Sequence, residues 1–506
     1  MYDSLPKEYK NIEWLEQKLN KYNEAEWATR GRNKALELFH SMAKRVPAYK
    51  DFLHKNNIDS LSIKTIEDFK HIPTIDKNNY LRVYPLEDLC WDGEFSSNRW
   101  TISTTSGSTG EPFYFPRQTD QSWQYAILAE LYLRANFQID KKKTLYIVGF
   151  PMGAWIGGLF TYQALELVAE KGNYPLSIIT PGIHKEEIIK AVKKFGDKFD
   201  QIIIGSYGPF LKDVLDDGIK MGLDWKKYNL KFIFSAEGFT ENFRDYVVRV
   251  AGLEDVALTS TLNHYGTVDL GTMSYETPLA ILIRRLALQN KSLYSDMFGN
   301  TIKLPTLTQY FPELFYFEDV AGGLICSSHS GLPLVRYDLK DNGGIITFEQ
   351  MLNIFNKQGI NLLSEAKKAG ISHTVWQLPF VYVYERNDFS VSFYAFNIYP
   401  ETIKRVLQKK ELEKFVTGKF TMLVSFDQNQ NQILEINIEM KSGVTKNEEL
   451  EKRLQNNCKL QLIEESSEYR ETYREKKDLI APHIILWPYE SSTYFKPGIK
   501  QKWVKK

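Results

Sequence analysis

The sequence predicts an α/β protein in which a large domain is followed by a smaller one. Strand-like and helical runs alternate between about residues 100 and 275, as in proteins whose parallel strands are joined by helices. With 506 residues, the chain is also longer than one hydrophobic core usually supports. Beyond about residue 385 the pattern restarts as a short α/β unit. We therefore expect a large N-terminal domain over residues 1–384 and a small C-terminal domain over residues 385–506.

The composition is that of an ordinary globular protein and excludes some functional classes. The formal net charge is +1, whereas a general nucleic-acid-binding protein normally shows a strong basic excess, so we expect no nucleic-acid partner. The three cysteines, Cys90, Cys326 and Cys458, match no zinc or redox spacing and fit a reducing compartment. The sequence has no apolar signal region at its start and no apolar run of about 18 residues. We therefore expect a cytoplasmic protein without a membrane span.

The first 95 residues are expected to form the helical N-terminal part of the large domain. Their apolar side chains recur at helical spacing, as on the buried face of a helix. The residues with this spacing are Trp14, Leu15, Leu19, Ala35, Leu36, Leu38, Phe39 and Met42.

The central part of the chain supplies the predicted parallel strands and the helices between them. Strands are expected over 144–148, 201–206 and 231–235, and helices over 162–168, 185–195 and 241–250. Thr240 stands where the N-cap of the last of these helices would lie. In such a fold, ligand-binding side chains are expected at the carboxyl ends of the strands.

Two later regions complete the predicted architecture. Residues 310–350 carry short β-like runs with glycine pairs at turns. The small domain is expected to contain strands over 389–396, 420–426 and 433–440, with a helix that begins at Pro400.

A loop rich in hydroxyls and glycines follows the apolar stretch at residues 100–102. Glycines let backbone N–H groups approach an anion closely, and serine and threonine hydroxyls add further donors. The loop is not a Walker motif, because no lysine follows its last glycine. An ordinary Ser/Gly turn is the alternative interpretation. The candidate phosphate-binding residues are Ser106, Gly107, Ser108, Thr109 and Gly110.

Four further segments carry candidate ligand-binding residues. The first two are Ser235-Ala236-Glu237-Gly238 and Tyr265-Gly266-Thr267-Val268-Asp269. The third, residues 333–341, ends in Asp341. In the fourth, Arg386 is followed by Asn397 and Pro400, eleven and fourteen positions later.

With the hydroxyl/glycine loop, these segments resemble, in order, five motifs of the adenylate-forming enzymes. That superfamily contains acyl-CoA synthetases, luciferases and the adenylation domains of nonribosomal peptide synthesis. The resemblance covers nearly the whole chain. It implies a large N-terminal domain of mixed sheets flanked by helices with a β-subdomain, and a small, mobile C-terminal α/β domain.

The resemblance also implies a role for each matched residue. The loop would hold the β- and γ-phosphates of ATP, and Asp269 would bind Mg²⁺ near the α-phosphate. Ala236 and Glu237 would line the adenine pocket, and Tyr265, followed by Gly266, would stack on adenine. Asp341 would accept hydrogen bonds from the ribose, and Arg386 would lie at the domain hinge.

A catalytic lysine is expected near the end of the chain, where relatives carry Gly-Lys-x-x-Arg/Lys. It would bridge the substrate carboxylate and the α-phosphate. The sequence here is Lys496-Pro497-Gly498-Ile499-Lys500-Gln501-Lys502. Lys500 is the first candidate and Lys502 the second, because one residue separates the glycine from the lysine. A solvated basic tail is the alternative interpretation.

Within the superfamily the chain most resembles the phenylacetate–CoA ligase branch and its CapK-like members. The matching segments are 45–49, 72–77, 275–276 and 336–337. The resemblance implies an ATP-dependent ligase that adenylates a small carboxylic acid, aromatic acids included, and releases pyrophosphate. The acyl group would then pass to CoA, a carrier protein, or an amine or hydroxyl acceptor.

The sequence departs from the family pattern at three positions. Asp269 replaces the usual glutamate, Val268 replaces a hydroxyl residue, and Ala395 stands where relatives have glycine. The last of these lies in a loop that forms part of the pantetheine tunnel, so it puts CoA as the acceptor in question. The altered acid and the atypical lysine segment motivate an alternative function, a non-catalytic nucleotide-binding pseudoenzyme or interaction protein with the same fold.

Three residues are candidates for the acyl pocket. Phe150 and Trp155 fall where relatives line that pocket, although aromatic clusters more often belong to the core. His264 directly precedes Tyr265 and could face the acyl group; a structural role is the alternative.

Overall fold

The computed structural model describes residues 5–105, 112–299, 304–329, 331–386, 390–412, 414–495 and 504. The chain divides into two compact units, Met1–Ser103 with Tyr114–Glu385, and Thr104–Phe113 with Arg386–Lys506. Among the described residues, none of the helices combines the length and hydrophobicity that crossing a bilayer requires.

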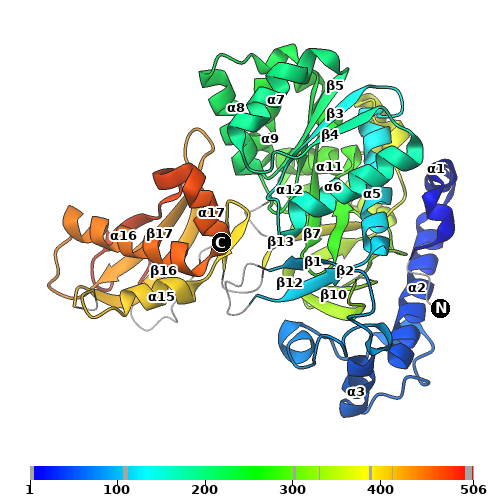
Figure 1. Ribbon diagram of the computed structural model, residues 1–506, viewed down its shortest axis with the longest axis horizontal. Coiled ribbons are helices and arrows are strands. Elements are labelled where there is room, and N and C mark those ends of the chain that lie inside the picture. The colour runs from blue at the N-terminus through cyan, green and yellow to red at the C-terminus, as the bar shows by residue number, and fades with distance from the viewer. Residues whose placement is uncertain are drawn as a thin grey trace. The chain divides into compact units, whose positions relative to one another are not determined.

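The first unit is built on a large mixed sheet (Figure 1). Over the described residues this sheet has 11 strands in the order β10-β11-β12-β13-β9-β8-β7-β6-β5-β3-β4. Strands β3 to β7 pair in parallel, and β8 and β9 continue the sheet in antiparallel pairs. The strands are β3 (Thr144–Gly149), β4 (Leu176–Ile179), β5 (Gln201–Ser206), β6 (Leu230–Phe234), β7 (Thr261–Thr267), β8 (Gly271–Tyr275), β9 (Thr306–Gln309), β10 (Tyr316–Val320), β11 (Gly323–Ser328), β12 (Leu334–Ile346) and β13 (Phe380–Arg386).

The central parallel strands are buried on both faces. Every residue of β3, β5 and β6 is buried, which explains their nearly continuous apolar sequences. The three strands predicted from these runs are confirmed.

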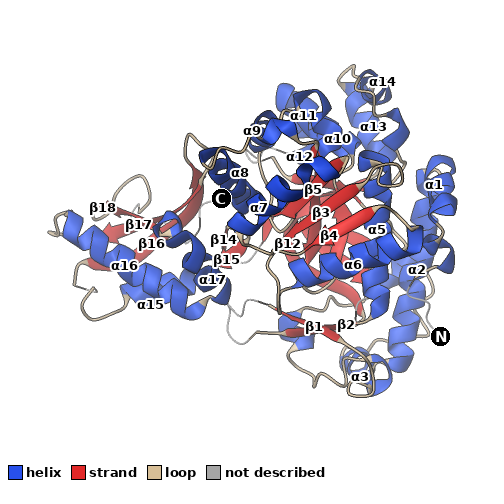
Figure 2. Ribbon diagram, turned by 45° about the horizontal axis from the view of Figure 1, so that its top comes forward, coloured by secondary structure: helices blue, strands red, loops and turns tan. Residues whose placement is uncertain are grey.

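Helices flank this sheet (Figure 2). Thr240 caps α9, since its hydroxyl accepts from the backbone N–H of Phe243 at 3.2 Å, as the sequence predicts. The helices between residues 119 and 260 are α5 (Thr119–Phe137), α6 (Ile156–Gly172), α7 (Lys185–Phe195), α8 (Gly208–Lys220), α9 (Glu241–Ala251) and α10 (Ala257–Ser260). The small strands β1 (Thr101–Thr104) and β2 (Tyr114–Arg117) form a separate two-stranded sheet.

The N-terminal residues form helices, of which α2 packs against the 311–313 segment of the same unit. Gly31 lies so close to Pro312 that a Cβ on it would be 2.4 Å from the proline Cβ. Arg30 donates to the carboxylate of Glu313 at 2.6 Å. These helices are α1 (Ile12–Lys21), α2 (Glu24–Arg45), α3 (Pro47–Lys55) and α4 (Ile66–Phe69).

A second apolar core lies between β9, β13 and four helices. Its members include Leu307 of β9 and Phe380 of β13, both fully buried. The helices are α11 (Pro278–Gln289), α12 (Lys291–Phe298), α13 (Phe348–Lys357) and α14 (Leu362–Lys368).

The second unit contains a three-stranded sheet and its own helices. Strand β16 pairs antiparallel with β17, and β17 pairs parallel with β18. The elements are β14 (Val391–Phe393), β15 (Phe396–Ile398), α15 (Pro400–Leu407), β16 (Val416–Phe426), β17 (Gln432–Met440), α16 (Glu448–Glu465), α17 (Ser467–Lys476) and β18 (His483–Trp487).

The single strand predicted over 389–396 is wrong. A tight hairpin, β14–β15, occupies this region, with its turn at Tyr394 and Ala395. Both turn residues have positive φ, +48° and +68°, a conformation that usually selects glycine or asparagine. The turn could not be predicted from the sequence, because neither residue is typical of turns and both lie in an apolar run. The backbone N–H of Tyr394 donates to Gln432 Oε1 at 2.7 Å, which ties the hairpin to β17.

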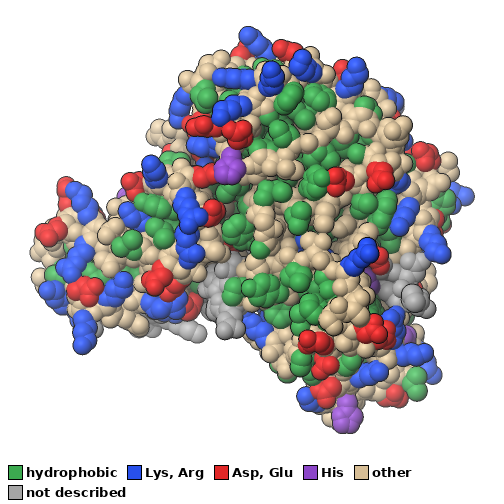
Figure 3. Space-filling model, in the orientation of Figure 1, with side chains coloured by type: hydrophobic (Ala, Val, Ile, Leu, Met, Phe, Trp, Pro, Cys, Tyr) green, Lys and Arg blue, Asp and Glu red, His purple; other side chains and the backbone are tan. Residues whose placement is uncertain are grey.

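Acidic and basic side chains are interspersed over the face shown in Figure 3. This distribution agrees with the formal net charge of +1.

Candidate active site

The candidate site lies at the carboxyl ends of β6 and β7 in the first unit. These strands run parallel, so the residues that end them meet at one edge of the sheet. Ala236, just beyond β6, has a φ of +76°, a left-handed conformation that residues with a Cβ seldom adopt. Asn263 on β7 donates from Nδ2 to the backbone carbonyl of Glu237 at 3.1 Å. This bond joins the segment 235–238 to the start of the segment that carries Tyr265.

Asn263 also presents a buried acceptor. The residue is 1% exposed, and its Oδ1 has no hydrogen-bond partner among the described residues. A buried polar atom left in this state costs about 1–3 kcal/mol. An amino group of a bound ligand, such as that of a purine, is the kind of donor that satisfies it.

Tyr265 and Asp341 form a buried pair between β7 and β12. The tyrosine hydroxyl donates to Asp341 Oδ2 at 2.7 Å. The Tyr265 ring stacks on that of Phe317, with 6.2 Å between centroids and 29° between the ring planes. The hydroxyl bond therefore fixes the orientation of the Asp341 carboxylate.

Asp269 lies in the turn between β7 and β8, and its carboxylate is held from two sides. The hydroxyl of Tyr337 donates to Oδ2 at 2.6 Å, and Lys77 Nζ lies 3.1 Å from Oδ1. Gly266 allows this hairpin to close, because a Cβ on it would lie 2.4 Å from the carbonyl oxygen of Gly271. The position of Asp269 thus depends on a glycine at 266.

One backbone contact brings Lys77 and Tyr337 to the same carboxylate. Ile75 pairs with β12: its N–H donates to the carbonyl of Arg336 at 3.1 Å, and its carbonyl accepts from Asp338 at 2.8 Å. Lys77 stands two residues beyond Ile75, at the start of the short helix η2 (Lys77–Leu81). The N-terminal part of the chain therefore contributes a cation to the site.

Arg336 strengthens the same contact. Its guanidinium donates to the carbonyls of Lys70 and Ile72, and its Nε lies 3.1 Å from Glu318 Oε2. The residue has a φ of +50°, so its backbone is held in an unfavourable region. These bonds fix residues 70–75 against β12.

Asp269 supplies one carboxylate that could bind a metal ion. The described residues contain no group of three or more histidine, cysteine, aspartate or glutamate side chains that could hold a metal ion. A magnesium ion needs few protein ligands when substrate phosphates and water supply the others, and one carboxylate suits that arrangement. Lys77 already neutralises this carboxylate, so a metal would share or replace that contact.

The candidate acyl-pocket residues lie in different surroundings. Phe150 is 4% exposed and follows β3, and Trp155 is the N-cap residue of α6. His264 is buried between the rings of Tyr125 and Tyr132, with centroids 5.7 and 5.2 Å away. Burial lowers the pKa of His264 to about 3, so the imidazole is neutral at physiological pH.

Several candidate residues lie outside the described residues. They are Ser106, Gly107, Ser108, Thr109, Gly110, Lys500 and Lys502, together with the side chain of Arg386. The residues that flank the loop are described: the N–H of Phe113 donates to Thr105 Oγ1 at 3.0 Å, and the N–H of Thr105 donates to the carbonyl of Phe113 at 3.1 Å.

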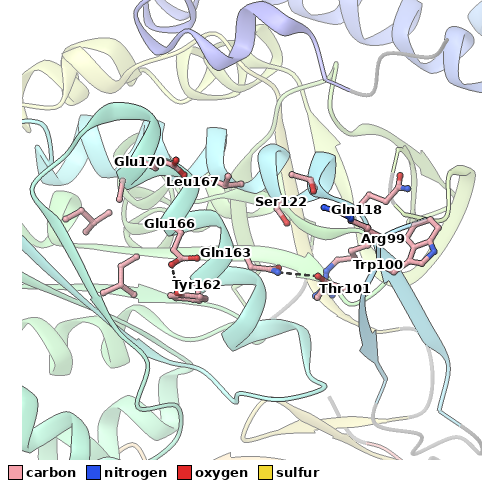
Figure 4. Close-up of a pocket in the computed structure, with 15 residues that line it drawn as sticks. Arg99, Trp100, Thr101, Gln118, Ser122, Tyr162, Gln163, Glu166, Leu167 and Glu170 are labelled. Atoms are coloured by element: carbon pink, nitrogen blue, oxygen red, sulfur yellow. Dashed lines mark hydrogen bonds between the residues drawn. The ribbon is translucent and has the colours of Figure 1, made fainter. Parts of the chain in front are cut away.

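A pocket of about 710 Å³ lies elsewhere in the first unit, between the start of α5 and the exposed face of α6 (Figure 4). Ser122 of α5 and Gln163, Tyr162 and Glu166 of α6 line it. Gln163 donates to Thr101 Oγ1 at 3.2 Å, the bond drawn in Figure 4. Arg117, at the end of β2, also lines this pocket.

Sequence reasoning did not single out four residues that the structure places at these sites. Asn263 precedes the Tyr265 motif by two positions and could have been found by extending that motif. Lys77 lies in a segment used only to assign the branch, and Tyr337 lies in the motif that ends in Asp341 but was not itself a candidate. Arg117 carries no local signal, since its burial depends on contacts that sequence spacing does not reveal.

Comparisons with known proteins give a result only at the level of structure. No protein-family model and no curated protein matches the sequence. A 2-hydroxyisobutyryl-CoA ligase, in complex with 2-HIB-AMP and CoA in the thioesterification state, aligns with a TM-score of 0.62 and 13% identity, over 95% of this chain and 90% of that chain. The same ligase in the postadenylation state, in complex with R3-HIB-AMP, aligns with a TM-score of 0.54 and 12% identity, over 97% of this chain and 91% of that chain.

An open conformation of that ligase, in complex with 2-HIB-AMP and CoA, is also similar. Its TM-score is 0.51 at 12% identity, over 94% of this chain and 90% of that chain. At such identities the likeness shows the fold alone. The expected adenylate-forming enzyme fold is therefore confirmed.

Proposed function

We propose that this protein is an ATP-dependent ligase that adenylates a small carboxylic acid. The observation that carries the proposal is the arrangement of Asn263, Tyr265 and Asp269 along β7 and its turn, with Asp341 of β12 bonded to Tyr265, in a fold shared with an acid–CoA ligase. Each of these groups has the chemistry that one part of ATP requires.

The nucleotide end of the site is proposed to recognise adenosine. Asn263 Oδ1 would accept from the amino group of adenine, and the Tyr265 ring would contact the base. Asp341 would accept hydrogen bonds from the ribose hydroxyls while Tyr265 holds its carboxylate in place. Ala236, Glu237 and Gly266 would shape the walls around the base.

The reacting end is proposed to lie beside Asp269. A substrate carboxylate oxygen attacks the α-phosphorus, the bond to the β-phosphate breaks, and pyrophosphate leaves. Mg²⁺, held by Asp269 together with the triphosphate, would offset the charge on the phosphates. Lys77 would add a second positive charge at this end, and residues 106–110 would bind the β- and γ-phosphates.

In the second step an acceptor attacks the acyl carbon and AMP leaves. CoA, a carrier protein, and an amine or hydroxyl compound are the acceptors we propose to test. Lys500, with Lys502 as the second candidate, is proposed to assist the first step. The phenylacetate–CoA ligase branch remains a prediction from the sequence.

Exchange of labelled pyrophosphate into ATP tests the first step without knowledge of the acceptor. With a panel of aliphatic and aromatic acids, we expect exchange with at least one acid. Lys500→Ala should abolish this exchange, and Lys502→Ala should retain it; the reverse pattern would assign the role to Lys502.

A nucleotide-binding pseudoenzyme is the second candidate function. The ion pair between Lys77 and Asp269 favours it, because the carboxylate expected to hold a metal is already neutralised. ATP binding by the chain with no exchange for any acid would support this function and contradict the ligase proposal.

A further inference from the structure

The pocket between α5 and α6 contains an arginine that nothing in the described part of the chain neutralises. Arg117 is 2% exposed, and its Nε, Nη1 and Nη2 have no hydrogen-bond partner among the described residues. The guanidinium lies over the ring of Phe160, 5.0 Å from its centroid. Burying a charged group in this way costs several kcal/mol unless a partner offsets it.

Two other fully buried arginines are each paired with a carboxylate, which offsets the cost of burying their charge. Arg244 donates to the carboxylate of Glu276 at 2.8 and 2.9 Å. Arg284 lies 2.6 Å from Glu276 and 2.9 Å from Glu241. Arg117 is as buried as these two arginines, but no carboxylate of the described residues pairs with it. Consistently, burial lowers the pKa of Arg117 to about 10.

Two further buried polar side chains lie on α5, the helix that follows Arg117. Gln121 and Gln124 are 2% and 1% exposed, and neither side-chain amide has a hydrogen-bond partner among the described residues. Gln121 Nε2 lies 3.4 Å from where a Cβ on Gly271 would stand. Buried polar groups normally have a hydrogen-bond partner, so the Arg117 guanidinium is available to a partner that the described residues do not supply.

The N-terminal end of α5 adds an electrostatic attraction for an anion. The helix begins at Thr119, and Gln118 at its N-cap makes no side-chain capping bond. Backbone N–H groups at such an end attract negative charge. Gln118, Thr119 and Ser122 all line the pocket with Arg117.

The rest of the lining limits the kind of anion. Glu166 and Glu170 stand on the α6 side and Arg99 on the side of β1, as Figure 4 shows. The two acids disfavour a multiply charged phosphate and leave room for a single negative charge. Apolar side chains, including Leu167 and Ile178, supply a surface for a hydrocarbon or aromatic body.

We propose that this pocket binds a small organic acid, whose carboxylate pairs with Arg117 and with the donors at the start of α5. None of the described residues that line this pocket is among those assigned to adenosine and phosphate, and the proposal does not depend on the proposed adenylation. The acid is either the substrate of the ligase or a second, non-reacting ligand.

Calorimetry on the full chain without nucleotide tests the proposal. The probes are acetate, benzoate, phenylacetate, lactate and succinate, with benzamide as a neutral analogue of benzoate. We expect at least one acid to bind, and benzamide to bind at least tenfold more weakly than benzoate if benzoate is that acid. Arg117→Met should lower the affinity for that acid at least tenfold. Arg99→Met, which removes an exposed arginine from the same pocket, should change its affinity less than twofold.

Two results would overturn the proposal. One is equal affinity of wild type and Arg117→Met for every acid that binds; the other is no binding of any of the acids to the wild type. A melting temperature provides a second test, because Arg117→Met removes an uncompensated charge and should melt at or above the wild type. A clearly lower melting temperature would mean that Arg117 is structurally paired, which also contradicts the proposal.

Pyrophosphate exchange shows whether the bound acid is the substrate of the ligase or a separate ligand. An acid that binds through Arg117 and supports exchange is the substrate, whereas one that binds without exchange is a separate ligand. Both results agree with the proposed site. If no acid supports exchange, the ligase proposal fails while the binding measurement still decides on this pocket.

Discussion

At the scale of single residues, the partners of Asp269 determine what its carboxylate can do. Lys77 and Tyr337 occupy its two oxygens, one each. The lysine is about one quarter exposed, so solvent can replace its contact without opening the core. The tyrosine is buried and orients the carboxylate. We therefore treat Asp269 as the phosphate-side acid and Lys77 as a cation that competes with a metal for it.

Asp269→Asn should lower pyrophosphate exchange by a factor on the order of 10²–10³, because it removes the only carboxylate assigned to the metal. Lys77→Met should lower the Mg²⁺ concentration needed for half-maximal exchange, since one competing cation is gone. Exchange rates measured over a magnesium titration check both variants. Undiminished exchange in Asp269→Asn, or a higher magnesium requirement in Lys77→Met, would contradict these assignments.

His264 should make the folded state less stable in acid. Burial lowers its pKa to about 3, whereas an unfolded histidine titrates near about 6.5. Between these values the unfolded chain binds a proton that the folded chain does not. Stability that is fully present above about pH 6.5 is therefore lost toward pH 3, by about 1.4 kcal/mol per pH unit.

Urea unfolding at a series of pH values between roughly 4 and 7 measures this dependence. His264→Phe should remove that contribution from the slope. His373→Phe, at an exposed histidine, should leave the slope as it is in the wild type. The same slope in wild type and His264→Phe would show that the imidazole is not held neutral by burial.

The motif residues of the candidate site could be singled out from the sequence, but the partners that hold them in the structure could not. Tyr265, Asp269 and Asp341 stand in recognisable local motifs. The bond from Tyr265 to Asp341 spans 76 positions and the bond from Tyr337 to Asp269 spans 68. Such pairs depend on strand order, which periodicity does not reveal.

At the scale of elements, two glycines allow close backbone approaches with different consequences. A Cβ on Gly266 would lie 2.4 Å from the carbonyl of Gly271, within the hairpin that carries Asp269. A Cβ on Gly31 would lie 2.4 Å from Pro312 Cβ, where α2 packs against the 311–313 segment. The steric conflict is the same in size, but only the first moves a candidate active-site group.

Gly266→Ala should therefore lower exchange by about 10²-fold, the loss expected from a displacement of about 1 Å at a reacting group. Gly31→Ala should lower the free energy of unfolding by about 1–3 kcal/mol and leave the exchange rate of the folded protein unchanged. Exchange assays and urea unfolding on both variants check the pair. A reversed pattern, with activity lost in Gly31→Ala and kept in Gly266→Ala, would contradict the placement of the site.

The sequence predicts helices and strands correctly where a local pattern, such as an apolar run or a helix cap, marks them. The buried runs of β3, β5 and β6 and the cap of α9 are local features, and the structure confirms them. The β14–β15 hairpin was not predicted because its turn residues, Tyr394 and Ala395, have positive φ values that their residue types do not indicate.

At the scale of the whole molecule, the adenylate-forming fold could be predicted because several weak motifs occur in a fixed order over nearly the whole chain. Each motif alone fits an ordinary turn or strand end. The structural likeness to a CoA ligase at 13% identity shows the same fold with mostly different side chains. The substrate acid and the acceptor could not be predicted, because the side chains that select them are scattered over many elements.

In the proposed reaction, the α-phosphorus of ATP takes an oxygen from a carboxylic acid. An acid labelled with oxygen-18 in its carboxylate, incubated with ATP, Mg²⁺ and an acceptor that supports turnover, tests it by mass spectrometry of the nucleotide products. We expect AMP that carries one labelled oxygen, together with unlabelled pyrophosphate. Unlabelled AMP, or ADP accompanied by labelled phosphate, would contradict adenylation.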